Sequence, residues 1–223
     1  MRIAIAAALV CGALAATPPA SAAPDACGAL GGVVESSGLC HVQAGAAGYA
    51  MDMRFPLDYP DTQAMVDYLT QTRDGFVNVA QTPDSRNVAH QMDVTAESFR
   101  SARTRSVVLT LFQDVGGAHP TTWYKSFTYD VDRRRPLTFD TLFAPGAKPL
   151  DDIFPIVQRT LQDETGLAAS ISPGDGRDPT HYQNFAVTDD AVIFFFGRAE
   201  LLPSYAGESS VTVPRNAIPP LQV

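Results

Sequence analysis

The chain contains serine, histidine and acidic residues, which together can form a triad that cleaves acyl bonds by nucleophilic attack. It lacks the Gly-x-Ser-x-Gly elbow of α/β-hydrolases, and the segment Gly207-Glu208-Ser209-Ser210 does not match that elbow. Because a triad is defined by geometry, no catalytic residue is assigned from the sequence. As an alternative to the binding function favoured below, the protein would be a small secreted esterase or serine hydrolase in which His119 or His181 acts as the base.

The histidines are scattered along the chain at His41, His90, His119 and His181. No two of them have the spacing of a metal-binding pair, so we expect no metal site. The chain also lacks a phosphate-binding P-loop and a dinucleotide fingerprint, so we expect no cofactor. Each isolated histidine is interpreted first as a surface residue or as a hydrogen-bonded structural residue.

The most distinctive segment is a glycine-rich turn that precedes the only tryptophan of the chain. Paired glycines permit positive φ and a close approach by another group. The simpler interpretation is a tight β-turn whose aromatic residues pack on a sheet. The alternative is a recognition loop with an exposed imidazole, because loops on rigid hairpins often carry binding residues. The binding-loop candidates are Gly116, Gly117, His119, Pro120, Trp123 and Tyr124.

Four further candidates lie outside that turn: His181, Asn184, Glu200 and Tyr205. Asn184 begins a segment, 184–196, in which the aromatic residues face both sides of a strand, as is typical of core β-structure. Glu200 is a candidate buried acceptor in the turn that follows, and Tyr205 would anchor that turn.

Two helices are predicted to position these residues. The first spans 61–81, with Asp61 as its N-cap and an apolar stripe at helical spacing. The second spans about 151–165 and ends at Gly166. Pro155 is expected in its first turn, where the N–H groups are unpaired in any case.

The strand patterns predict a mainly antiparallel sheet. The apolar run 107–112 indicates a central strand covered on both faces. Gly116 and Gly117 then turn the chain back into a hairpin. The predicted strands are 49–55, 90–99, 105–115, 122–130, 184–187, 191–196 and 210–213. Their order with the two helices predicts a single α+β domain over 24–223, with the sheet packed against two principal helices.

The N-terminal segment 1–23 is predicted to be a cleavable signal peptide. Arg2 precedes a short apolar run, which is followed by prolines and by the small residues Ala20-Ser21-Ala22-Ala23. The apolar run is shorter than the roughly 20 residues of a membrane span. We therefore expect a secreted, extracellular protein, in part associated with the cell wall, with no stable membrane insertion and in monomeric form.

Once the leader is removed, Cys27 and Cys40 are the remaining cysteines. In an oxidising compartment such an even pair is usually a disulfide. The alternative, a metal site that includes His41, lacks a second pair of ligands. A disulfide here would staple the glycine-rich loop 28–38 and stabilise the fold by roughly 3 kcal/mol.

Composition narrows the range of partners. The formal net charge is −8, which disfavours nucleic acid because phosphate contacts need a basic surface. The basic cluster Arg133-Arg134-Arg135 is interpreted as a solvated turn, or else as a contact for an acidic partner. The expected partner is an unidentified protein or cell-envelope ligand.

Several segments resemble the domain of unknown function DUF3298, over about 105–214. They are the Gly116-Gly117-Ala118-His119 turn, Thr141-Leu142-Phe143, the segment 184–196 and the segment 200–207. That domain occurs in the ectodomain of a lysozyme-sensing anti-sigma factor and beside some polysaccharide deacetylases. The whole chain, with its cysteine pair and the segment 182–188, is similar to the secreted mycobacterial immunogenic antigens of the MPT/MPB64 type.

The resemblance implies an α+β domain, an extracellular or cell-wall location and recognition by host immunity as an antigen. The anti-sigma relatives use the domain to bind a protein, which favours a binding module over an enzyme. Some secreted relatives are esterase-like, which keeps the esterase alternative open.

Overall fold

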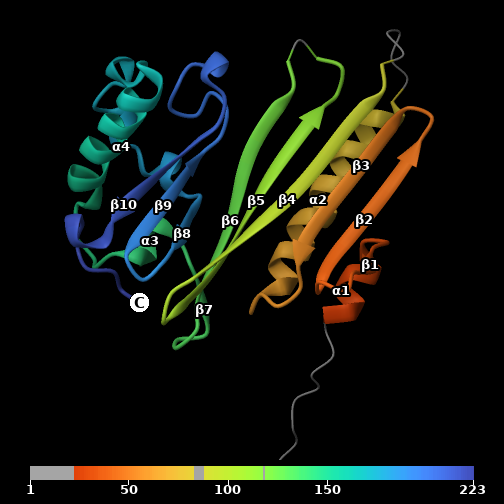
Figure 1. Ribbon diagram of the computed structural model, residues 1–223, viewed down its shortest axis with the longest axis horizontal. Helices are drawn as coiled ribbons and strands as arrows, with labels where there is room; N and C mark the ends of the chain where they lie inside the picture. The colour runs from red at the N-terminus through yellow and green to blue at the C-terminus, as the bar shows by residue number, and fades with distance from the viewer. Residues whose placement is uncertain (1–22, 83–87, 118) are drawn as a thin grey trace, which may run out of the picture.

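The computed structural model describes residues 23–82, 88–117 and 119–223. The predicted leader lies outside the described residues except for Ala23. The fold is α+β, as the sequence predicts, and consists of a seven-stranded sheet and a three-stranded sheet. Figure 1 shows the larger sheet with one long helix behind it, and the smaller sheet beside it with a second helix. Among the described residues, no helix has both the length and the apolar character needed to cross a membrane.

The larger sheet has its strands in sequence order, β1 to β7. Its strands are β1 (Val33–Val34), β2 (Leu39–Ala46), β3 (Tyr49–Pro56), β4 (His90–Arg100), β5 (Thr104–Asp114), β6 (Thr121–Asp130) and β7 (Arg135–Leu137). All neighbours are antiparallel except β3 and β4, which are parallel and are connected through helix α2 (Thr62–Gln81). A parallel pair needs such a crossover because a tight turn cannot return the chain in the same direction.

Helix α2 covers one face of this sheet, and its predicted N-cap is confirmed. The Asp61 carboxylate accepts a hydrogen bond from the N–H of Ala64 at 3.4 Å. Met65, Leu69 and Phe76 are buried in the core between the helix and the sheet. The sequence prediction missed β2, because its second half is made of small and polar residues instead of an apolar alternation.

The second half of the chain builds its own core. Helices α3 (Phe139–Leu142) and α4 (Pro149–Thr165) precede strands β8 (Phe185–Val187), β9 (Ala191–Phe196) and β10 (Ser209–Pro214). Five short 3-10 helices lie in this half: η1 (Ala168–Ser170), η2 (Asp175–Arg177), η3 (Pro179–Tyr182), η4 (Ser204–Ala206) and η5 (Arg215–Ala217). The buried ring of Tyr182 contacts Phe194 and Phe196 edge-on at the centre of this core.

Helix α4 differs from the prediction in one respect. It begins at Pro149 and ends at Thr165, with Gly166 as its C-cap at a left-handed φ of 72°. Pro155 therefore lies in the second turn, not in the first as expected, and its ring nitrogen cannot donate a hydrogen bond to the preceding turn. The apolar stripe Ile153, Val157 and Leu161 still packs into the core, and this packing offsets the lost bond.

The predicted disulfide between Cys27 and Cys40 is confirmed, with sulfur atoms 2.03 Å apart. It joins helix α1 (Ala23–Ala29) to β2, so the stapled segment is partly helical and partly strand rather than wholly a loop. Gly32 packs against this bond, because a Cβ atom there would lie 2.8 Å from both sulfur atoms.

Four hydroxyl side chains join the two sheets. Thr104, Ser106, Ser126 and Thr128 point from β5 and β6 toward β8, and we call them the hydroxyl seam. Oγ of Ser126 accepts the N–H of Phe185 at 2.9 Å, and Oγ of Ser106 accepts the N–H of Val187 at 3.3 Å. The hydroxyl of Thr128 donates to the carbonyl of Phe185 at 2.9 Å, and that of Thr104 donates to the carbonyl of Val187 at 3.3 Å.

We predict that Ser106→Ala destabilises the protein by about 1–3 kcal/mol, because the buried N–H of Val187 loses its acceptor. Urea unfolding measures the difference. The matched control is Ser210→Ala, which removes an exposed hydroxyl from β10. Equal unfolding free energies for the two variants would contradict the role of the seam.

Candidate functional site

Several of the candidate residues meet along the edge of β6 that faces away from β5. The turn before β6 contacts the connection after β9, because the guanidinium of Arg198 donates to the carbonyl of Pro120 at 2.8 Å. The backbone N–H of Arg198 also donates to the carbonyl of Thr122 at 3.1 Å. Arg198 was not singled out in the sequence, since nothing local indicates a partner 78 residues away.

Asn184 lies further along the same edge. Its side-chain oxygen accepts the backbone N–H of Ser126 at 3.1 Å, and so takes the place of a strand partner for β6. The Ser126 hydroxyl donates to the carbonyl of Gln183 at 3.3 Å. These bonds fix the segment that follows His181, the last-turn residue of η3.

Glu200 occupies a half-buried position in the connection after β9. Its Oε2 accepts the N–H of Gly197 at 2.6 Å. Burial raises the pKa of the Glu200 carboxyl, although the Gly197 hydrogen bond and the nearby His181 imidazole each oppose this rise. Gly197 itself approaches β6 closely, since a Cβ there would lie 3.4 Å from Cα of Trp123. We call His181, Asn184 and Glu200 together the Glu200 site.

The other binding-loop candidates are divided between two faces of the large sheet. The indole N–H of Trp123 donates to the hydroxyl of Tyr68 on α2 at 2.9 Å, so this ring packs on the helix side. Tyr124 lies on the opposite side, where its ring contacts Phe195 at 5.3 Å between centroids. Burial raises the pKa of the Tyr124 hydroxyl, and the charges of Glu208 and Glu97 add to this effect.

Of the two glycines in the turn, Gly116 has the positive φ that the sequence permits, and Gly117 does not. Gly116 has a φ of 71° and approaches the side chain of Val88, while Gly117 is exposed. The side chain of His119 is exposed. Tyr205 is 75% exposed and makes no described contact with the Glu200 site.

The remaining histidines lie elsewhere in the fold. Both ring nitrogens of His41 lie 3.0 Å from carboxylates, Nδ1 from Glu35 and Nε2 from Asp52. The guanidinium of Arg54 lies 2.8 Å from the carboxylate of Asp52 and so belongs to the same network of charged side chains. His90 is buried at the start of β4.

No serine hydroxyl is hydrogen-bonded to a histidine within residues 23–82, 88–117 and 119–223. The same residues contain no group of three histidine, cysteine, aspartate or glutamate side chains arranged to hold a metal ion. What the Glu200 site offers is a half-buried carboxyl whose pKa the partly exposed imidazole of His181 acts to lower. Such a pair can take up and deliver protons.

Comparison with known proteins shows that the second half of the chain matches the model of a protein family. The family model described as "Protein of unknown function (DUF3298)" matches residues 140–216. This range contains α4 and the three-stranded sheet, including His181, Asn184 and Glu200.

Relatives that match most of the chain come from mycobacteria. The chain is 54% identical over 227 residues to Esterase Rv3036c of Mycobacterium tuberculosis, with both chains covered completely. It is 43% identical over 204 residues to Immunogenic protein MPT64 of Mycobacterium tuberculosis and to Immunogenic protein MPB64 of Mycobacterium bovis, in each case over 89% of both chains.

Among solved structures, a DUF3298 family protein from Pseudomonas aeruginosa PAO1 has a TM-score of 0.56. It covers 82% of this chain and 93% of its own, at 14% sequence identity. At that identity the match shows a shared fold.

We predict that the pKa of the Glu200 carboxyl is higher than that of an exposed glutamate, which is about 4.3. Since its folded-state pKa is raised, its contribution to stability is complete below the unfolded pKa and is lost as pH rises through the folded pKa. Glu200→Gln can still accept the Gly197 N–H, and it should flatten the fall in unfolding free energy that begins as the pH rises through the unfolded-state pKa. Urea unfolding at a series of pH values measures how the unfolding free energy changes with pH. An identical slope in wild type and Glu200→Gln would contradict the raised pKa of Glu200.

Proposed function

Because the chain belongs to the family of the mycobacterial immunogenic proteins MPT64 and MPB64, we propose that it is an exported protein that hydrolyses small acyl esters at the Glu200 site. The observation that carries this proposal is the relative named an esterase, which is 54% identical over both complete chains. Export is supported by the leader-like segment 1–23 and by the disulfide, which persists in oxidising compartments.

His181 is the imidazole best suited to act as the base. His41 has both ring nitrogens engaged with carboxylates, and His90 is buried. His119 lies on an exposed turn, whereas His181 is partly exposed and interacts with Glu200. A base beside a carboxylate is favoured because the carboxylate stabilises the imidazolium that forms.

Water is the nucleophile in this proposal, since no described serine is hydrogen-bonded to His181. His181 takes a proton from water as the water oxygen bonds to the acyl carbon. The carbon–oxygen bond to the leaving alcohol then breaks, and the imidazolium returns the proton to that alcohol. No acyl-enzyme forms on this route.

We predict that the leaderless protein releases p-nitrophenol from p-nitrophenyl acetate faster than buffer does. His181→Ala should lower kcat about 100-fold or more, as expected for loss of a general base. The matched control is His119→Ala, which should retain the wild-type rate. Full activity in His181→Ala, or a burst of one equivalent that labels a serine, would contradict this mechanism.

The second candidate function is a binding module for a protein or a cell-envelope ligand. The observation that favours it is the pair of exposed residues Gly117 and His119, next to Pro120, whose carbonyl accepts a hydrogen bond from Arg198 at 2.8 Å. A loop that is already held by a hydrogen bond loses less conformational entropy on binding a partner than a loop that is free to move.

For this candidate we predict that His119→Ala reduces the capture of a partner from cell-wall extract, with Arg159→Ala on α4 as the surface control. Trp123 is unsuitable for this test, because its side chain supports α2. Identical capture profiles for wild type and His119→Ala would exclude the loop as the contact. Ester turnover that depends on His181, together with an unchanged capture profile, would favour the hydrolase.

A further inference from the structure

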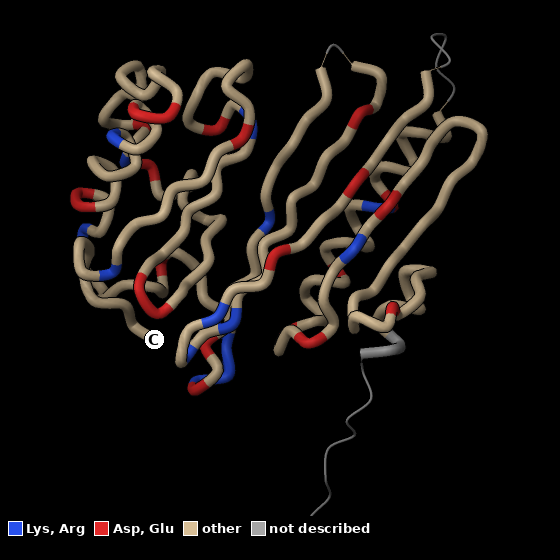
Figure 2. The backbone as a smooth tube through the Cα atoms, in the orientation of Figure 1, with Lys and Arg blue, Asp and Glu red and all other residues tan. Residues whose placement is uncertain are grey.

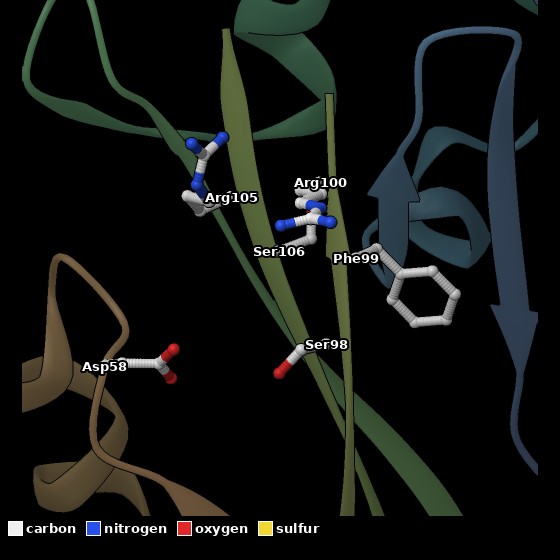
Figure 3. A pocket seen from close by; sticks show the side chains of 6 residues that line it. All are labelled: Asp58, Ser98, Phe99, Arg100, Arg105 and Ser106. Atoms are coloured by element: carbon white, nitrogen blue, oxygen red, sulfur yellow. The ribbon is translucent and has the colours of Figure 1, made fainter. Parts of the chain in front are cut away.

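A pocket lies at the opposite end of β4 and β5 from the turn 116–120. It has a volume of about 400 Å³ and is lined by Asp58, Ser98, Phe99, Arg100, Arg105 and Ser106. Figure 3 shows the Asp58 carboxylate and the Ser98 hydroxyl pointing toward one another, with the two arginines above them. The ring of Phe99 turns away and packs against Phe195.

The two arginines of the pocket are cross-strand neighbours with the same charge. Arg100 and Arg105 are directly opposite in the antiparallel register of β4 and β5. Like charges at such positions are destabilising. In the described part of the chain, no carboxylate lies within 4.0 Å of either guanidinium. Arg105 donates to the carbonyls of Ser101 and Thr104, while Arg100 is exposed and makes no described side-chain bond.

The surrounding surface is also basic, on a chain whose net charge is −8. Figure 2 shows basic residues, all of them arginines in the sequence, gathered among acidic ones at this end of the molecule, around the β4–β5 and β6–β7 turns. Two of these arginines already have acidic partners, Arg103 with Asp132 at 3.4 Å and Arg133 with Asp130 at 2.8 Å. Arg100 and Arg105 differ from these two, because among the described residues neither guanidinium has a carboxylate within 4.0 Å.

The far side of the pocket has different chemistry. The Asp58 carboxylate accepts hydrogen bonds and repels anions, and the Ser98 hydroxyl both donates and accepts. A fitting ligand therefore carries a single negative group at the arginine end and hydroxyl or amide donors at the Asp58 end. A sugar that bears a carboxylate meets both conditions. Because of Asp58, a dianionic phosphate fits less well.

We propose that this pocket binds the carboxylate-bearing sugar units of an acidic polysaccharide. The carboxylate lies between Arg100 and Arg105, and the sugar hydroxyls donate to Asp58. A membrane surface is disfavoured, because Val131, only 38% exposed, is the one large exposed hydrophobic side chain on the two turns at this end. The site is separate from the Glu200 site and would make the protein adhere to a glycan layer whether or not it hydrolyses esters.

Isothermal titration with a hyaluronan tetrasaccharide tests this proposal, with chitotetraose as the neutral probe. Wild-type protein should bind the acidic probe and not the neutral one, and the binding should weaken as salt is raised. Arg100→Gln should weaken binding at least tenfold, because it removes a charge-assisted contact. Arg159→Gln on α4 is the matched control and should bind as wild type does. His181→Ala should also bind as wild type does, which separates this site from the proposed hydrolase.

No binding of the tetrasaccharide, or equal affinity in wild type and Arg100→Gln, would overturn the proposal. Circular dichroism of Arg100→Gln verifies that the variant is folded, as expected for a side chain without a described partner. The same titration is repeated with inorganic phosphate and with phosphatidylglycerol vesicles as probes. Tighter Arg100-dependent binding to either of these than to the tetrasaccharide would assign the pocket to phosphate or to a membrane instead.

Discussion

The constraint on which this structure depends is the hydrogen bonding of β8. One edge of this strand pairs with β9, while its other edge lies on the face of β5 and β6 with no strand beside it. Buried backbone groups must find partners, and a missing one costs about 1–3 kcal/mol. The hydroxyl seam supplies these partners from side chains, so that a three-stranded sheet can lie across a seven-stranded one without joining it.

The seam also determines where the candidate site lies. It fixes Phe185 and Asn184 against Ser126, and so aligns the segment after His181 with the free edge of β6. Arg198 does the same for the connection after β9 through its bonds to the turn before β6. The site is thus formed by connections held on two rigid sheets, an arrangement common for binding and catalytic residues.

Local patterns allowed much of the fold to be predicted. Asp61 and the stripe that follows it define α2, and the apolar run 107–112 indicates the central strand β5. The family resemblance and the disulfide are also confirmed. Strand β2 was missed because Gln43 to Ala46 lie on an exposed edge and need no apolar alternation. The hydrogen bond of Arg198 to Pro120 and the electrostatic effect of His181 on Glu200 depend on tertiary packing, which no local pattern encodes.

The central claim is that side-chain hydroxyls act as the missing strand for β8, and amide hydrogen exchange tests it directly. The informative groups are the N–H groups of Phe185 and Val187, which Ser126 and Ser106 accept. The account predicts that both amides exchange as slowly as the β9 amides in the core, and that Ser106→Ala selectively accelerates Val187. Exchange of both amides at the rate of exposed loop amides in the wild-type protein would contradict it.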